Sequence, residues 1–330
     1  MTINLKSFVA AAAIALIGTS SWAAEYTMRL SHQFPPSHPS AKRLEQFAKD
    51  VAKDTDGKVE VQLFGGAQLY NPKQHLAAVA SGEIESAVIL NLQWGGTLPE
   101  MSVALIPYLI SSPKDQKAFI ASDAAKFLDE KMLKKGVKNI AWMVDTNDLI
   151  FTSNGHPLEK PSDFKGVKIR GLTPIFDAGL KAMGATTVVM PGSETYQALQ
   201  TGVVDAGVTG VAAAYSRKFY EVQKYGRATP IFVAFDNLVV NPAWFNGLPA
   251  DVQKGIEKAA ATAVADSITP TDSVDPKKID NLTGVGMDAR VLTPDETAAL
   301  KAAMQPAVEA AFVEKAGDEG KKLLDLVGKM

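Results

Sequence analysis

The strongest chemical signal in the sequence is Arg170, which closes a short apolar segment at residues 167–170. Thr173 and Pro174 follow, and they predict a helix start, because threonine is a good N-cap and proline suits the first helical turn. The helix is expected to end at Gly184. Free N–H groups at a helix start attract anions, and the planar fork of an arginine can hold a carboxylate through two hydrogen bonds. We therefore predict an anion-binding site at Arg170.

The elements around this site alternate between strand and helix patterns, which predicts an α/β fold. In the first part of the chain, strands are expected at residues 26–30, 59–63 and 86–90, and helices at 41–55 and 71–82. Such a β-α-β-α-β unit implies a parallel sheet, whose ligands lie beyond the carboxyl ends of the strands. Those ends carry Gln33, residues 65–66 and residues 91–94.

A second unit repeats this pattern without sequence identity. Strands are expected at residues 140–144, 150–153, 167–170, 187–190 and 203–208, with a helix capped by Ser193 between the last two. The chain should therefore form two α/β lobes that face each other. We place residues 24–148 and about 237–276 in the first lobe, and about 149–236 and 277–330 in the second. The last helix should start at a capping box at Thr293 and kink or split at Pro306.

The N-terminal residues predict export. Lys6, an apolar run at residues 8–17 and a small-x-small pattern ending at Ala23 are typical of a secretory signal peptide, removed after Ala23. The mature protein is then expected in the periplasm without stable membrane insertion, since no other apolar segment is long enough to span a bilayer. The chain has no cysteine, which excludes disulfides and thiol catalysis. A net charge of −2 gives no indication of the basic surface that binds nucleic acid.

Catalytic motifs are missing from the sequence. None of the four histidines has metal-ligand spacing, and there is no His-Glu-x-x-His, Gly-x-Ser-x-Gly or phosphate-binding glycine loop. We predict a binding protein without cofactors rather than an enzyme. A secreted hydrolase with scattered catalytic groups is the least favoured alternative.

The motifs together resemble one protein family, the DctP-type periplasmic solute-binding proteins of TRAP (tripartite ATP-independent periplasmic) transporters. The most specific motif is Pro161-Ser162-Asp163-Phe164-Lys165-Gly166-Val167-Lys168-Ile169-Arg170. Further matching segments occur in family order and spacing at residues 64–69, 183–185, 194–205, 219–225 and 248–253. The resemblance covers nearly the whole mature chain.

The resemblance implies a two-lobed clamshell of the type II-like periplasmic-binding-protein class, closing on a small organic acid in the interdomain cleft. Arg170 would grip the ligand carboxylate, and the closed protein would dock on the small and large membrane subunits of the permease. Four residues after Asp205, where family members often have asparagine, this chain has Thr209. The other predicted ligand-binding residues are Gln33, Asn91, Trp94, Asp148, Thr173 and Asn237, and Trp94, Phe176 and Phe235 are aromatic candidates for shape selection.

One departure from the family pattern bears on the ligand. Many members carry a second arginine shortly before the Pro-x-Asp-x-x-Gly turn, whereas residues 145–150 here contain Asp145 and Asp148 and no arginine. Like charges cost most where water is excluded, so we predict a monoanion, with hydroxyls or an amine that Asp148 could receive. Alternatively, both aspartates are loop or N-cap residues facing water. A module that feeds a sensor kinase or an ATP-driven importer is the alternative function.

Overall fold

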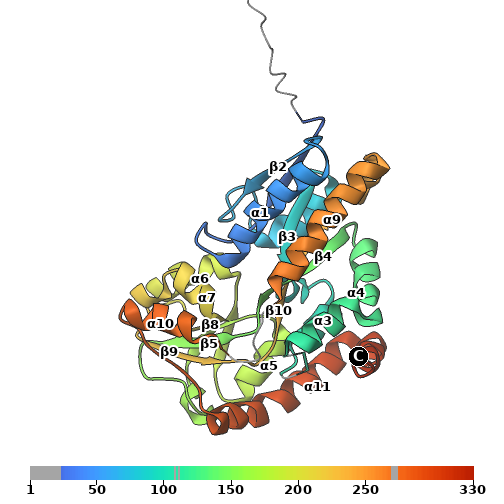
Figure 1. Cartoon of the computed structure of the whole chain (residues 1–330). Helices are drawn as coiled ribbons and strands as arrows, with labels where there is room; N and C mark the ends of the chain where they lie inside the picture. The colour runs from blue at the N-terminus through green and yellow to red at the C-terminus, as the bar shows by residue number, and fades with distance from the viewer. Residues whose placement is uncertain (1–23, 108, 111, 269–273) are drawn as a thin grey trace, which may run out of the picture.

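The computed structural model describes residues 24–107, 109–110, 112–268 and 274–330, so the predicted signal peptide lies outside the described residues. Within them the chain forms two β-sheets, each covered by helices, which face each other as the two lobes of a clamshell (Figure 1). This confirms the predicted α/β class and architecture. None of the described helices is both long and apolar enough to cross a membrane.

The first sheet contains five strands in the order β2 (Val59–Phe64), β1 (Tyr26–Ser31), β3 (Ser86–Leu90), β10 (Ala234–Val240) and β4 (Lys138–Thr146). As predicted from the β-α-β-α-β pattern, β1 pairs in parallel with both β2 and β3. Strand β10 arrives from much later in the sequence and lies antiparallel between β3 and β4. The sheet is therefore completed in its middle by a strand from beyond residue 230.

The second sheet contains six strands in the order β11 (Asp288–Val291), β9 (Tyr225–Thr229), β5 (Leu149–Ser153), β8 (Ala206–Gly210), β6 (Lys168–Gly171) and β7 (Thr186–Val189). Strand β6 contains Arg170 as its third residue and pairs in parallel with β7 and β8. The carboxyl ends of β6 and β8 thus meet at the same edge of the sheet, which places Arg170 beside Thr209 and Gly210.

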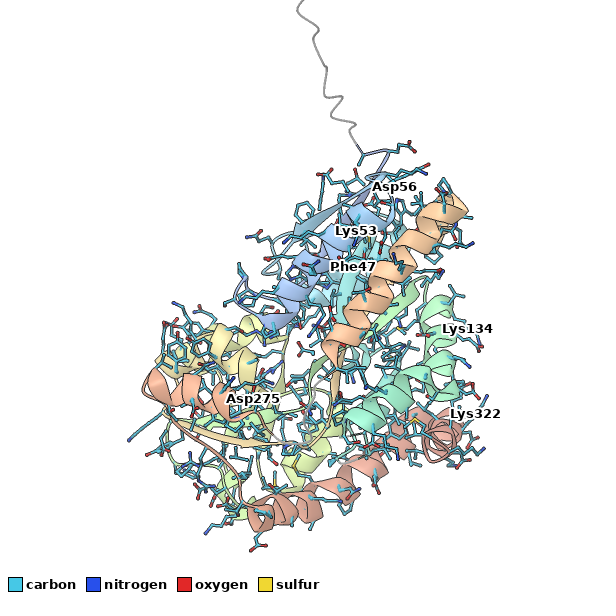
Figure 2. All side chains as sticks on the ribbon, in the orientation of Figure 1. Phe47, Lys53, Asp56, Lys134, Asp275 and Lys322 are labelled. Carbon is cyan, nitrogen blue, oxygen red and sulfur yellow. The ribbon has the colours of Figure 1, made fainter. Side chains whose placement is uncertain are left out.

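Helices cover both faces of each sheet. They are α1 (Pro39–Asp54), α2 (His75–Ser81), α3 (Pro113–Ala121), α4 (Asp123–Lys134), α5 (Pro174–Ala182), α6 (Gly192–Gln200), α7 (Val211–Ser216), α8 (Pro242–Gly247), α9 (Ala250–Ser267), α10 (Pro276–Gly284) and α11 (Pro294–Val327). Short 3₁₀ helices lie at η1 (Pro72–Gln74), η2 (Asn91–Trp94), η3 (Pro99–Leu105), η4 (Pro161–Phe164) and η5 (Phe219–Glu221). Phe47 of α1 is fully buried in the core of the first lobe, whereas Lys134 and Lys322 lie on the outer surface (Figure 2).

The chain crosses between the lobes three times, from β4 to β5, from β9 to β10 and from α9 to α10. In addition, α11 packs on α5 in the second lobe and on η3 and α4 in the first, and it runs along the base of the molecule in Figure 1. Strand β10 begins at Ala234, slightly before the predicted change of lobe. The lobe boundaries given from the sequence stay a prediction.

Two local predictions differ from the structure. Helix α11 is not split at Pro306 but continues through it, and it departs from helical geometry at Gly317, with φ of 57° and ψ of −142°. Met304 and Val308, on either side of the proline, are fully buried against Gly179 of α5, and this packing keeps the helix continuous where a backbone hydrogen bond is lost. Ser193 does not cap α6, whose N-cap is Pro191 without a side-chain bond.

Candidate functional site

A cavity with about 370 Å³ of empty space lies between the two sheets. Its polar wall is formed by side chains that follow or end several strands of both lobes, namely Gln33, Asp145, Thr146, Arg170, Thr209 and Arg217. Its apolar wall comes from Leu90, Leu92, Leu149, Leu172, Phe232 and Ala234. A cavity that combines an apolar wall with convergent polar groups suits a small organic molecule.

Arg170 is held by backbone carbonyls at the cavity wall, and its side chain is 3% exposed. Its Nε and Nη2 donate to the carbonyl of Met190, each at 3.2 Å, and Nη1 donates to the carbonyl of Val208 at 2.6 Å. A guanidinium has five N–H donors, so two remain after these three bonds, one on each Nη. These two donors are available to bind a carboxylate.

The charge of Arg170 is not neutralised by a direct ion pair with any described residue. Burial first, and then the nearby Arg217, lower the pKa of Arg170 to about 9, so it stays protonated at neutral pH. Asp177 acts on it only through space, because its Oδ1 accepts from the Leu172 N–H at 2.9 Å. Gly171 is required here, since a side chain at that position would overlap the Asp177 carboxylate. A buried positive charge of this kind is completed by an anion.

A second arginine, Arg217, reaches the same cavity from the end of α7. Its guanidinium lies against Gly192, where an added Cβ would come within 2.6 Å of Nη1. Nη1 donates to Oγ1 of Thr209 at 3.4 Å, and the buried Nε has no partner among the described residues. Burial lowers the pKa of Arg217, while the charges of Asp145 and Asp236 act in the opposite direction.

An acidic pair lies beside Arg217. Asp145 lines the cavity and accepts a hydrogen bond from the Ser40 hydroxyl at 2.8 Å. Asp236 follows the cavity-lining Ala234 by two residues on the same face of β10, and it is 1% exposed. Burial raises the pKa of Asp145. Burial, and then the neighbouring Asp145, hold the pKa of Asp236 well above its usual range.

Three of the predicted ligand-binding residues lie at the cavity wall, namely Arg170, Gln33 and Thr209. The buried Oε1 of Gln33 has no partner among the described residues. Thr173 caps α5 by accepting from the Phe176 N–H at 3.0 Å. It lines an adjoining, more apolar cavity of about 480 Å³, which shares Leu92 and Leu172 with the first.

The other predicted residues lie outside this wall. Asp148 forms an ion pair with Lys278 at 2.7 Å and accepts from the Thr146 hydroxyl at 2.7 Å. Asn91 accepts from the Phe235 N–H at 3.1 Å, and Asn237 is fully buried on β10. Trp94, Phe235 and Phe176 belong to the hydrophobic cores, and the aromatic residue at the cavity is Phe232, which packs edge-on against Phe176.

Sequence reasoning missed Arg217. The family pattern places a second arginine near residues 145–150, whereas the arginine that lines the cavity comes eight residues after Thr209. A signal was present, because Arg217 follows a six-residue helix that starts at the carboxyl end of β8, the strand already assigned to the cleft. In the described part of the chain, no group of three or more potential metal ligands comes together.

Comparisons with known proteins agree with this geometry. Residues 30–315 match DctP, the family described as bacterial extracellular solute-binding protein, family 7. The C4-dicarboxylate-binding periplasmic protein DctP of Rhodobacter capsulatus is 30% identical over 321 residues, which cover 96% of this chain and 95% of that protein.

Two solved structures share the fold. A TRAP periplasmic solute-binding protein from Desulfovibrio salexigens with bound orotic acid is 29% identical, with a TM-score of 0.85, over 92% of this chain and 98% of that one. One from Sulfurospirillum deleyianum with bound succinate is 26% identical, with a TM-score of 0.82, over 92% and 99%. The resemblance seen in the motifs is thereby confirmed, and the chain belongs to the DctP family of bacterial extracellular solute-binding proteins.

Proposed function

We propose that this protein is the periplasmic substrate-binding component of a TRAP transporter. It captures a small organic acid in the cleft and delivers it to the small and large subunits of the membrane permease. The observation that carries the proposal is Arg170, a buried arginine fixed by two backbone carbonyls with two N–H donors left for a carboxylate. Both solved relatives are TRAP solute-binding proteins, which favours that permease over a sensor kinase or an ATP-driven importer as the partner.

Binding drives closure of the two lobes in this proposal. In an open form, water solvates Arg170, and a carboxylate docks on the second lobe. Closure brings Gln33 and Asp145 of the first lobe to the ligand and expels water, which strengthens each polar contact. Only the part of the affinity that differs between the open and closed forms shifts the equilibrium. The protein performs no covalent chemistry, and the closed shape is the signal to the permease.

The charges at the cavity wall favour a ligand with a single negative charge. Arg170 and Arg217 contribute two positive charges, and Asp145 contributes one negative charge when it is ionised. A monoanion balances this set, whereas a second carboxylate would leave an excess of negative charge in a buried site. The relatives hold orotic acid and succinate, so membership of the family leaves the charge of the ligand open.

The test is a thermal-shift screen of the mature protein against small organic acids, followed by calorimetric titration of each hit. The protein is first unfolded and refolded, which removes acids trapped during expression. We expect Arg170→Ala to weaken binding about 100-fold or more, because it removes a buried charge-assisted pair. Arg170→Lys should also lose at least tenfold, because an ammonium cannot form the two-pronged contact.

Arg29→Ala is the control, since Arg29 pairs with Glu85 away from the cavity. It should bind every hit as the unmodified protein does. An acid that binds equally well to Arg170→Ala would show that the anion site lies elsewhere. A protein that binds only uncharged solutes would refute the proposed function.

A further inference from the structure

Arg217 is placed for a partner that the protein itself does not supply. Among the described residues its one hydrogen bond is the long contact to Thr209, and no carboxylate comes within ion-pairing distance of it. Gly192 keeps open the space that the guanidinium occupies. A buried guanidinium with a bare Nε is costly unless a further acceptor completes it, so the cavity itself is where that acceptor belongs.

Asp145 provides the complementary acceptor at the same wall. Ser40 occupies Oδ1 of its carboxylate, which is buried and lines the cavity. Arg217 and Asp145 line the same cavity and influence each other electrostatically without forming an ion pair. A donor and an acceptor that face the same space select a group able to accept and donate at once.

Building on the proposed function, we infer that Arg217 and Asp145 form a second binding site within the cavity. This site binds a neutral donor–acceptor group on a monocarboxylate held by Arg170. An alcohol meets this requirement, since its oxygen accepts from Arg217 while its hydrogen donates to Asp145. A lactam meets it through its carbonyl and its N–H. A second carboxylate would satisfy Arg217 but would repel Asp145. Arg170 would thus set the affinity for acids in general, and this pair would set which acids are chosen.

Matched acids test the inference in titrations of the refolded, ligand-free protein. Lactate is compared with propionate, and pyroglutamate with cyclopentanecarboxylate, because each pair differs mainly in the donor–acceptor group. We expect the polar member of at least one pair to bind tenfold or more tightly in the unmodified protein. In Arg217→Gln and in Asp145→Asn the ratio of the two affinities should fall below about threefold. The affinity for the member without the donor–acceptor group should change little.

Gly192→Ala is a second variant that leaves the charge of Arg217 intact but fills the space of its guanidinium. It should reduce the ratio of affinities in the same way. This result would show that the position of the Arg217 guanidinium matters in addition to its charge. Arg170→Ala should lose both members of each pair, and that result tests the proposed function independently.

Three results would overturn the inference. The first is an equal loss of both members of a pair in Arg217→Gln, which would make Arg217 a structural residue. The second is preferred binding of succinate that disappears in Arg217→Gln, which would assign Arg217 to a second carboxylate. The third is a protein that binds acids through Arg170 but does not prefer the polar member of either pair.

Discussion

At the scale of single residues, Arg170 is oriented by neutral groups rather than by carboxylates. The carbonyls of Met190 and Val208 fix three of its five N–H donors, yet they leave its full charge for the ligand. A carboxylate in their place would have to be displaced or would repel the incoming acid. Because the guanidinium is already positioned, little side-chain entropy is lost when the ligand binds.

Buried histidines make the stability of the first lobe depend on pH. The pKa values of His32 and His75 are each lowered to about 4, mainly by burial. The neutral ring is therefore favoured in the folded protein, and unfolding takes up protons as the pH falls below the ordinary value of 6.5. The stabilisation is complete above that value and is lost towards pH 4.

We expect His75→Gln to lose less stability on acidification than the unmodified protein, by about 2 kcal/mol between pH 7.5 and 5. Urea unfolding at the two pH values measures this difference. The variant keeps a polar side chain that can reach Ser31 and the Val88 carbonyl, both of which His75 contacts. His156→Gln, at an exposed position, is the control and should follow the unmodified protein. Identical pH profiles for His75→Gln and the unmodified protein would refute this origin.

The sequence alone could reveal Arg170 but not Arg217, and the reason is physical. Arg170 lies in a local pattern of strand, arginine, N-cap and proline, and all of these are readable from neighbouring positions. Arg217 reaches the cavity where its guanidinium packs on Gly192 of α6, a contact between separate elements. Asp148 failed to reach the wall for a similar reason, since the distant Lys278 holds its carboxylate.

At the scale of elements, one close contact between the lobes lies where the end of η2 meets the start of α5. A Cβ added to Gly95 would lie 3.2 Å from Cβ of Thr173, which is tighter than most contacts between carbon atoms. Gly95 belongs to the loop after η2 in the first lobe, and Thr173 is the N-cap of α5 in the second. The absence of a side chain at Gly95 therefore permits the closed form.

We expect Gly95→Val to weaken ligand binding tenfold or more while the ligand-free protein keeps its thermal stability. The valine would hold the lobes apart, and an open cleft forfeits the contacts of one lobe. Gly96→Val is the matched control, because nothing lies within 4 Å of a Cβ added there. Titration and small-angle scattering with and without ligand measure affinity and closure. Equal effects of the two substitutions would show that the contact between lobes is not the cause.

Most helices and strands were predictable, because alternation, caps and turn residues act locally. The predicted strands at residues 26–30, 59–63 and 86–90 and the capping box at Thr293 match the structure. The helix is not split at Pro306, because packing of α11 on α5 outweighs the missing hydrogen bond there. The position of β10 inside the first sheet depends on long-range pairing, which no local pattern encodes.

At the scale of the whole molecule, α11 belongs to both lobes. Its first turns pack on α5, and its last turns place Leu323 and Val327 in the core that also contains Phe119 and Trp142 of the first lobe. Lys131 of α4 pairs with both Glu100 and Glu319, which ties this end of α11 to the first lobe. The C-terminal helix is therefore a structural part of the clamshell.

We expect Leu323→Ala to lower the free energy of unfolding by about 3 kcal/mol, because it opens a cavity at a fully buried position. The loss should appear as a shift of the main urea transition, since this core is shared by α11 and the first lobe. Lys322→Ala, one residue earlier and exposed, should change stability by less than about 1 kcal/mol. A separate early transition in Leu323→Ala would instead show that the end of α11 unfolds on its own.

The place of β10 between β3 and β4 has a consequence for the protein while it is being synthesised. The first 150 residues contain four of the five strands of the first sheet, but the strand that joins β3 to β4 ends at Val240. A nascent chain that has not reached this residue cannot close the sheet or bury its two faces. Most of the polypeptide therefore emerges before the first lobe can become stable, which suits the export that the proposed function requires.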